Sequence, residues 1–269
     1  MDFHTQKNFR RIVYQHYAQN ARSLPWRLTH DPYKILVSEI MLQQTQVPRV
    51  VEKYPLFIKR FPTIEILARA HLRSVIRAWQ GLGYNRRALL LHRLAREVVR
   101  ACAGRIPRNP EDLEKLPGIG EATAASICAF AFNSPVVFIE TNIRSVFIHH
   151  FFKDRTNVND QELLPYVEET LDRKNPWRWY SALMDYGVYL KSIVSNPSRR
   201  SRHYVKQSPF EGSRRQIRGM IMAMLAKRRY LVVGALPALV RAPAPRAYSV
   251  MEALCREGLI KRSGQMLTI

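Results

Sequence analysis

Hydrophobic positions recur at helical spacing over most of the chain. Apolar runs interrupted by polar positions predict helices at 5–20, 32–42, 49–60, 86–103, 120–131, 140–151, 160–171 and 177–191. Asp31 can cap the second of these, and Pro32 fits its first turn because no intrahelical N–H is needed there. Short proline-containing connectors separate the helices. The pattern therefore predicts an all-α fold.

The pattern changes near residue 213. Helical spacing covers 213–227 and 246–258, and 259–269 predicts two short strands about a Ser–Gly turn. This order is typical of a small winged-helix-like (α+β) module. The stretch 241–246, which holds two prolines, is expected to be a short stiff linker. Such a module is either a DNA-binding element, which would act in addition to any other in the chain, or a packing appendage that completes the fold.

Composition indicates a polyanionic partner. The chain has 269 residues, 46% of them hydrophobic, which is enough for two or three packed units. Its formal net charge is +22 and its sequence pI is about 10.5, so nucleic acid is the first candidate. Positive charge is concentrated in 199–229, where Glu211 is the only acid and Tyr204 and Phe210 interleave with the basic residues.

Cysteine usage narrows the chemistry. Cys102, Cys128 and Cys255 are scattered and form no CxxC pair, which excludes a disulfide framework and a cysteine-built zinc or iron-sulfur site. No apolar stretch reaches membrane-spanning length, and residues 1–7 lack a signal-like apolar region. We expect a cytoplasmic, nucleoid-associated protein in a reducing compartment, without membrane contact.

The segment Leu116–Gly120 has the composition of a phosphate-binding hairpin. Pro117 fixes one φ, while Gly118 and Gly120 permit backbone conformations closed to other residues. The chain can then turn tightly into the helix predicted from 120 and leave N–H groups for a phosphate oxygen. On these residues alone, an ordinary turn between two helices remains an equal alternative.

Five motifs in this order resemble the helix-hairpin-helix DNA glycosylases, in the branch of endonuclease III and the adenine glycosylase MutY. They are Leu24–Arg27, Ser38–Gln46, Gly81–Tyr84, Leu116–Gly120 and Met184–Gly187. The resemblance covers about 22–190 and implies a two-lobed helical fold that binds double-stranded DNA and turns the target nucleotide into a pocket. The lobes would be a helical barrel at 23–133 and a second lobe formed by 1–22 and 134–212, followed by the module at 213–269.

The resemblance also implies DNA contacts. Residues that would fill the gap in the duplex or touch the opposing base are Gln43, Gln44, Thr45, Leu82 and Tyr84. A phosphate would be bound by the backbone amides of Gly118, Ile119 and Gly120. The resemblance also allows a monovalent cation bound by the carbonyl oxygens of this hairpin. The alternatives are a core aromatic for Tyr84 and a solvated helix face for the glutamines.

Two carboxylates fit the chemistry of breaking an N-glycosidic bond, which needs an acid at the base and negative charge at the sugar. Glu39 lies on an apolar helix, where partial desolvation would raise a carboxyl pKa, and it matches the catalytic glutamate of the family. Its alternative is a salt-bridged surface glutamate. Glu140 stands where the family has an aspartate, with Asn142 as a pocket or water-positioning residue; its alternative is a helix cap.

Other positions depart from the family. Ala122 replaces the lysine that forms a Schiff base in bifunctional members, so lyase activity is not expected. No cysteine follows Met184–Gly187, so we expect no iron-sulfur cluster and no other cofactor. In family members with a cluster, the cluster orders a loop that contacts DNA; here we expect Arg199, Arg200 and Arg202 to make those contacts. We expect Arg27 to help order the pocket.

The resemblance therefore implies a monofunctional glycosylase of base excision repair that removes adenine mispaired with guanine or 8-oxoguanine, and we expect it to be a monomer. A uracil or thymine mismatch glycosylase on the same fold remains an alternative. A DNA-binding protein without catalysis is the second alternative.

Overall fold

The computed structural model describes residues 3–269. Met1 and Asp2, the start of the segment 1–22 expected in the second lobe, lie outside the described residues. The chain divides into two compact units. Unit 1 comprises 1–36, 107–115 and 119–206, and unit 2 comprises 37–106, 116–118 and 207–269. The three-part division expected from the sequence stays a prediction.

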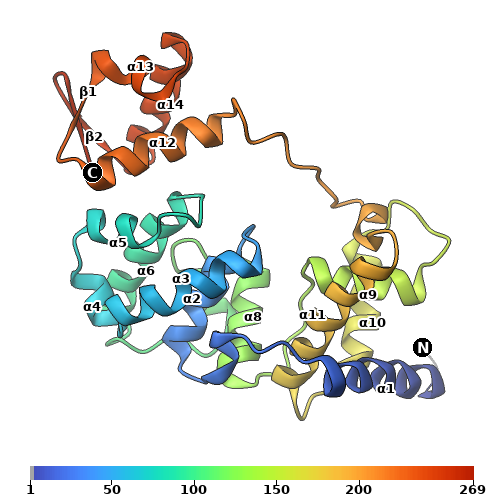
Figure 1. Ribbon diagram of the computed structural model, residues 1–269. Helices are drawn as coiled ribbons and strands as arrows, with labels where there is room; N and C mark the ends of the chain where they lie inside the picture. Colours follow the sequence, from blue (N-terminus) through green and yellow to red (C-terminus); the bar gives the residue numbers. More distant parts are fainter. Residues whose placement is uncertain (1–2) are drawn as a thin grey trace. The chain divides into compact units, whose positions relative to one another are not determined.

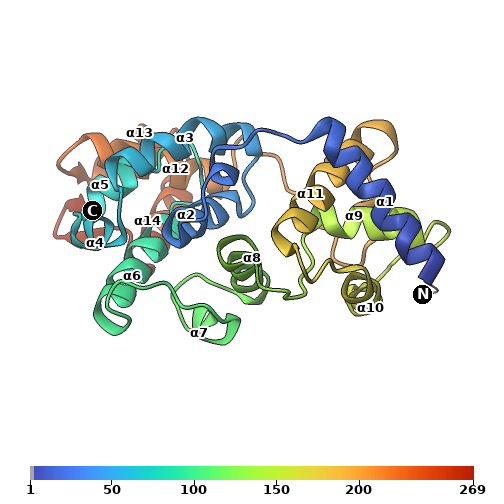
Figure 2. The ribbon, with the colours of Figure 1, turned by 90° about the horizontal axis from the view of Figure 1, so that it is seen from below.

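Unit 1 is built around α11 (Pro176–Ile193), which packs against α1 (Phe3–Asn20) and α9 (Thr141–Phe151) (Figures 1 and 2). Its other elements are η1 (Pro25–Leu28), α7 (Pro110–Glu114), α8 (Glu121–Phe132), α10 (Asp160–Thr170) and η2 (Pro197–Arg200). Phe9 of α1 packs edge-on against Trp179 of α11 and also contacts the Phe147 ring of α9. These buried aromatic contacts hold the three helices together.

Unit 2 begins within α2 (Pro32–Leu42). It continues through α3 (Val47–Arg60), α4 (Ile64–Arg69), α5 (Leu72–Ala78) and α6 (Arg86–Ala101). Thr63 caps α4 by accepting a hydrogen bond from the Ile66 N–H, which explains why the chain turns back into a helix after Pro62. Phe57 and Trp79 pack edge-on in the core, and both are fully buried.

The C-terminal module is part of unit 2. Its elements are α12 (Arg214–Lys227), β1 (Leu231–Val232), η3 (Val233–Ala235), α13 (Leu236–Val240), α14 (Ala244–Arg256), β2 (Lys261–Ser263) and β3 (Met266–Thr268) (Figure 1). The antiparallel sheet has the order β1-β3-β2, with Leu267 opposite both Leu231 and Arg262. Helix α12 packs on α5, and Arg77 donates two hydrogen bonds to the Ala226 carbonyl (3.1 and 2.9 Å).

The predicted fold class is confirmed: the chain is mainly helical and ends in a winged-helix-like module. The stiff linker expected at 241–246 is wrong. Ala244 and Pro245 form the first turn of α14, where proline costs no intrahelical hydrogen bond, so only a short turn separates α13 from α14. Within residues 3–269, no helix is both long and apolar enough to span a membrane.

Candidate nucleic-acid and catalytic site

Glu39 lies in the second half of α2, half-buried between the fully buried Ser38 and the nearly buried Ile40. Helix α2 is apolar because Ile35, Leu36 and Val37 pack in the core together with Met41. The carboxylate therefore stands on a helix with little freedom to move. Its half-buried carboxyl group is partly desolvated, which is compatible with a role as a general acid.

The end of α2 is held by Arg87, a residue that the sequence analysis missed. Arg87 is buried on α6, and its Nη1 donates to the carbonyl oxygens of Ile40 (2.9 Å) and Met41 (2.8 Å) in the last turn of α2. These carbonyls carry the negative end of the helix dipole, so a buried cation is electrostatically matched to them. Burial lowers the pKa of Arg87 to about 10, so the guanidinium stays charged at neutral pH.

The same guanidinium holds the loop after α2. Its Nη1 donates to the Gln43 carbonyl (2.5 Å), and its Nη2 donates to the Thr45 hydroxyl (2.8 Å). Gln44, between them, is exposed and has φ of +52°, a conformation that costs energy for a residue with a side chain. The Gln43 side-chain amide donates to the Gly118 carbonyl at 3.5 Å. Arg87 thus holds Gln44 in a strained, solvent-facing position.

The loop Gly81–Tyr84 is the third segment held by Arg87. Its Nη2 donates to the carbonyls of Leu82 (3.1 Å) and Gly83 (3.3 Å). Leu82 is only 2% exposed, so its side chain packs in the core and the expected surface contact is not available to it. Tyr84 is 38% exposed with φ of +45°, and its ring lies over the Arg87 guanidinium at 5.5 Å. Tyr84 is therefore presented at the surface rather than placed in the core.

The hairpin Leu116–Gly120 connects α7 to α8. Gly118 has φ of +85°, and a Cβ there would lie 2.9 Å from the Leu90 Cβ, so both conformation and space require glycine. Ile119 is buried and anchors the turn, while Gly118 and Gly120 are exposed. Gly120 is the N-cap of α8, whose first N–H groups have no intrahelical acceptor. Ala122 is exposed in the first turn of α8.

In unit 1, Glu140 is the N-cap of α9. Its Oε1 accepts hydrogen bonds from the backbone N–H groups of Asn142 (2.8 Å) and Ile143 (3.0 Å). Its Oε2 accepts one from the Asn142 side-chain amide (3.2 Å). The capping alternative is therefore realised in the structure. It fixes a half-buried carboxylate in one orientation, which is compatible with a catalytic role.

Lys191 completes this group and was also missed. Its Nζ on α11 donates to the Asn142 Oδ1 at 2.8 Å, which fixes the amide so that Nδ2 faces Glu140. Burial lowers the pKa of the Lys191 amine, and the charge of Glu140 acts in the opposite direction. Gly187, one turn earlier, allows the approach: a Cβ there would lie 2.6 Å from the Asn142 carbonyl oxygen. The Met184–Gly187 motif thus positions the start of α9.

Arg27 is not a surface cation. Its side chain is 9% exposed and forms a bidentate pair with Asp185, with both N–O distances 2.8 Å. Arg22 adds a third charged contact to the same carboxylate at 2.6 Å. Burial alone would raise the pKa of Asp185, but the Arg27 hydrogen bonds and charge, with those of Arg22, lower it. The structure gives Arg27 a positioning role for η1 and α11.

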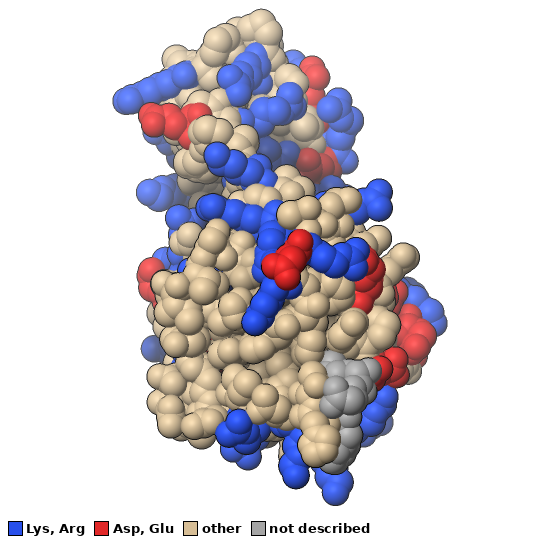
Figure 3. Space-filling model, turned by 90° about the vertical axis from the view of Figure 1, so that its right-hand side faces the viewer, with Lys and Arg blue, Asp and Glu red and all other residues tan. Residues whose placement is uncertain are grey.

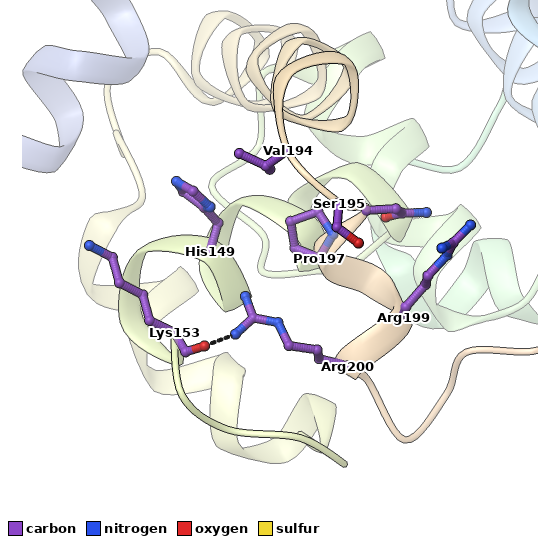
Figure 4. Close-up of a pocket in the computed structure, with 8 residues that line it drawn as sticks. His149, Lys153, Val194, Ser195, Pro197, Arg199 and Arg200 are labelled. Atoms are coloured by element: carbon purple, nitrogen blue, oxygen red, sulfur yellow. Dashed lines mark hydrogen bonds between the residues drawn. The ribbon is translucent and has the colours of Figure 1, made fainter.

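Residues 194–200, directly after α11, form one wall of a pocket of about 420 Å³ (Figure 4). Its lining includes His149, Lys153, Arg199 and Arg200 and no carboxylate. Arg200 donates to the carbonyls of Phe152 (2.9 Å) and Lys153, so it mainly caps the end of α9. Arg199 and Arg202 are exposed. Burial, followed by the charges of Lys153 and Arg200, lowers the pKa of His149, as expected in a cationic pocket.

A family-type iron-sulfur cluster does not fit this chain. Residues 188–207 contain no cysteine, although these residues follow Met184–Gly187 directly. Among residues 3–269, no group of three or more His, Cys, Asp or Glu side chains is placed to hold a metal ion.

Comparison with known proteins matches residues 37–168 to the HhH-GPD superfamily base excision DNA repair proteins. An adenine DNA glycosylase of Buchnera aphidicola subsp. Baizongia pistaciae is 36% identical over 188 residues, covering 68% of this chain and 52% of that protein. One from Mycobacterium tuberculosis (strain CDC 1551 / Oshkosh) is 42% identical over 131 residues, covering 48% of this chain and 43% of that protein. The chain thus spans about half the length of these curated relatives.

Among solved structures, a thermostable thymine-DNA glycosylase has a TM-score of 0.64 and 26% sequence identity. The match covers 73% of this chain and 92% of that chain.

Proposed function

Because the chain belongs to the HhH-GPD superfamily of base excision DNA repair proteins, we propose that it is a monofunctional DNA glycosylase that removes adenine mispaired with guanine or 8-oxoguanine. The observation that carries this proposal is the contact set of Arg87. One buried guanidinium fixes the end of the Glu39 helix and both loops that the resemblance assigns to DNA. The names of the curated relatives support adenine as the target.

In the proposed reaction, Glu39 protonates the adenine as it leaves, which reduces the negative charge that builds up on the base. Glu140 supplies negative charge to the oxocarbenium-like sugar or orients the attacking water, and Asn142 holds that carboxylate in place. Ala122 offers no amine for a Schiff base, so the product is an abasic site in an intact strand.

We propose that duplex DNA is bound through its phosphates and through exposed loop residues. The net charge of +22 and the excess of Lys and Arg over Asp and Glu on the face shown in Figure 3 support this partner. The amides of Gly118, Ile119 and Gly120 would bind one phosphate, and the pocket lined by Lys153 and Arg199 would bind another. Gln43, Gln44 and Tyr84 would contact the bases.

A second candidate is a thymine or uracil mismatch glycosylase. The likeness to a thymine-DNA glycosylase over 73% of this chain favours it. Both candidates use the same fold, and the pocket for the extruded base decides between them.

The test uses duplexes containing A·G, A·8-oxoG, U·G or T·G, incubated with the protein and then treated with alkali to cut abasic sites. Cleavage of the adenine strand alone, lost in Glu39→Gln, is the expected result. Cleavage at U or T would transfer the assignment to the second candidate. Tight binding without any abasic product would contradict both and leave a DNA-binding protein.

A further inference from the structure

Aromatic rings and guanidinium groups alternate from the core of unit 2 to its surface. The Arg87 guanidinium lies 5.4 Å from the ring of the fully buried Trp79 and 5.5 Å from the ring of Tyr84. Arg215, in the first turn of α12, lies 6.0 Å from the ring of Phe210, which is exposed. The Tyr84 hydroxyl joins the two halves of this series. The series connects the loop Gly81–Tyr84 with the C-terminal module.

Two side chains from beyond residue 206 hold that hydroxyl. The Gln207 Nε2 donates to the Tyr84 Oη at 3.0 Å, and the Arg215 Nη1 lies 3.5 Å from the same oxygen. Arg215 also donates to the Gln207 Oε1 (3.2 Å) and to the Ser208 carbonyl (2.6 Å). Each member of this group therefore fixes another. The Tyr84 ring is held from beneath by Arg87 and at its tip by Gln207 and Arg215.

Holding Tyr84 in this conformation costs free energy, and packing in the core does not explain that cost. Tyr84 has a positive φ that its side chain disfavours, and it remains exposed in spite of its three partners. A surface aromatic held in one orientation presents a fixed face for stacking on a base. A ring that cannot swing aside fits some bases and excludes others, which is how rigid contacts produce specificity.

We propose that Gln207 and Arg215 are specificity-determining residues that fix Tyr84 and thereby set the discrimination for the base opposite the excised one. The inference rests on the proposed function, because it assigns Tyr84 to the opposing base. It gives the segment 207–215 a role in reading DNA that none of the sequence motifs indicates. The C-terminal module thus contributes to base selection through a contact with Tyr84 rather than by an independent binding site.

The experiment measures single-turnover release of adenine opposite guanine and opposite cytosine, and uses the ratio of the two rates. Variants are Gln207→Leu, Arg215→Met, Tyr84→Phe and the double variant Tyr84→Phe with Gln207→Leu. Arg214→Met is the matched control, because Arg214 is the adjacent residue of α12, carries the same charge, and bonds Ser249 instead of Tyr84. Thermal unfolding of each variant verifies that it is folded.

We expect each single variant of the group to lower the ratio about fivefold, and the double variant to lower it no further, because both changes remove the same hydrogen bond. Arg214→Met should keep the wild-type ratio. Because both variants lose one positive charge, DNA affinity should depend on salt concentration in the same way for Arg214→Met and Arg215→Met. An unchanged ratio in Gln207→Leu and Arg215→Met would overturn the inference, as would additive losses in the double variant.

Failure of the proposed function would look different. A wild-type protein that releases no base from any duplex would refute the glycosylase assignment. The ratio of dissociation constants for the same two duplexes would then decide the inference, and equal ratios in wild type and Gln207→Leu would overturn it.

Discussion

The end of α2 and the start of α9 each hold a carboxylate, and the chain stabilises them by opposite means. At the end of α2, a buried cation, Arg87, satisfies the last carbonyls of the helix that carries Glu39. At the start of α9, the carboxylate of Glu140 itself satisfies the first N–H groups. Both arrangements match the helix dipole.

The two arrangements differ in the group that satisfies the helix end, which is Arg87 in α2 and the carboxylate of Glu140 in α9. The helix that carries Glu39 is held at its end by Arg87, which donates to the carbonyls of Ile40 and Met41. Glu140 satisfies the first N–H groups of α9 through its Oε1, so its position and its charge are tied to the stability of α9. Changes at the two helix ends should therefore separate stability from chemistry in different ways.

The largest loss of stability is expected from Arg87→Met. It removes a buried charged group and leaves carbonyls from three segments without their donor, which should lower the free energy of unfolding by about 3 kcal/mol. Chemical denaturation measures it. Arg86→Met, at the exposed neighbouring position, is the control and should cost little. Equal losses in the two variants would contradict the role given to Arg87.

Gly187→Ala should come next. The new Cβ would lie 2.6 Å from the Asn142 carbonyl oxygen and 2.7 Å from the Asn142 Cβ, so α9 and α11 must move apart, at a cost of about 2 kcal/mol. Gly219→Ala in α12 is the control, because a Cβ there would meet no atom within 4 Å outside its chain neighbours and the helix's own backbone, and alanine should stabilise that helix by up to about 1 kcal/mol. A stable Gly187→Ala protein would show that the close approach is not needed.

Glu140→Gln separates capping from catalysis. An amide oxygen still accepts the N–H bonds but loses the favourable charge, so stability should fall by about 1 kcal/mol, while adenine release should slow about 100-fold. Glu162→Gln, in the capping box of α10, should also lose some stability and keep the rate. If both variants keep the rate, Glu140 is only a cap.

The smallest effect on stability is expected from Lys191→Met. Burial lowers the pKa of Lys191, so the folded protein binds protons there less readily than the unfolded chain, and the charged amine opposes folding at neutral pH. Removing it should therefore raise stability slightly, by less than about 1 kcal/mol. This gain should shrink as the pH rises from the folded to the unfolded pKa. Unfolding measured at pH 7 and pH 10 checks this, and a gain that grows with pH would contradict it.

The main helices and the strands β2 and β3 could be predicted because their signals are local, whereas the two-residue strand β1 was missed. Pro32 opens α2, as its sequence indicates; β2 and β3 are joined by a turn at Gly264 and Gln265, one residue later than the predicted Ser–Gly turn because Ser263 still pairs with Met266. The short helices α4, α5, α7 and α13 escaped prediction because five to seven residues carry too little periodicity. At 241–246, the two prolines predict a linker, but proline also opens helices, and Pro245 lies in the first turn of α14.

Site residues that belong to a sequence motif could be predicted, whereas Arg87 and Lys191, which act through contacts with other segments, could not. Arg87 bonds mainly to backbone carbonyls, and those of Met41 and Gln43 are more than 40 residues away, so no pattern of side chains marks it among so many arginines. Its place three residues after Gly81–Tyr84 is the one local signal. Lys191 lies four residues after Gly187, which puts it on the same helix face, but only the packing of α9 on α11 reveals its partner.

The most direct test compares single-turnover adenine release from an A·8-oxoG duplex by the wild type, Glu39→Gln and Glu140→Gln, with unfolding measured on the same samples. We predict release by the wild type, rates at least about 100-fold lower in both variants, and a loss of stability of about 1 kcal/mol in Glu140→Gln. Full activity of Glu39→Gln, or no release by the wild type, would contradict the assignment of Glu39 as the acid of an adenine glycosylase.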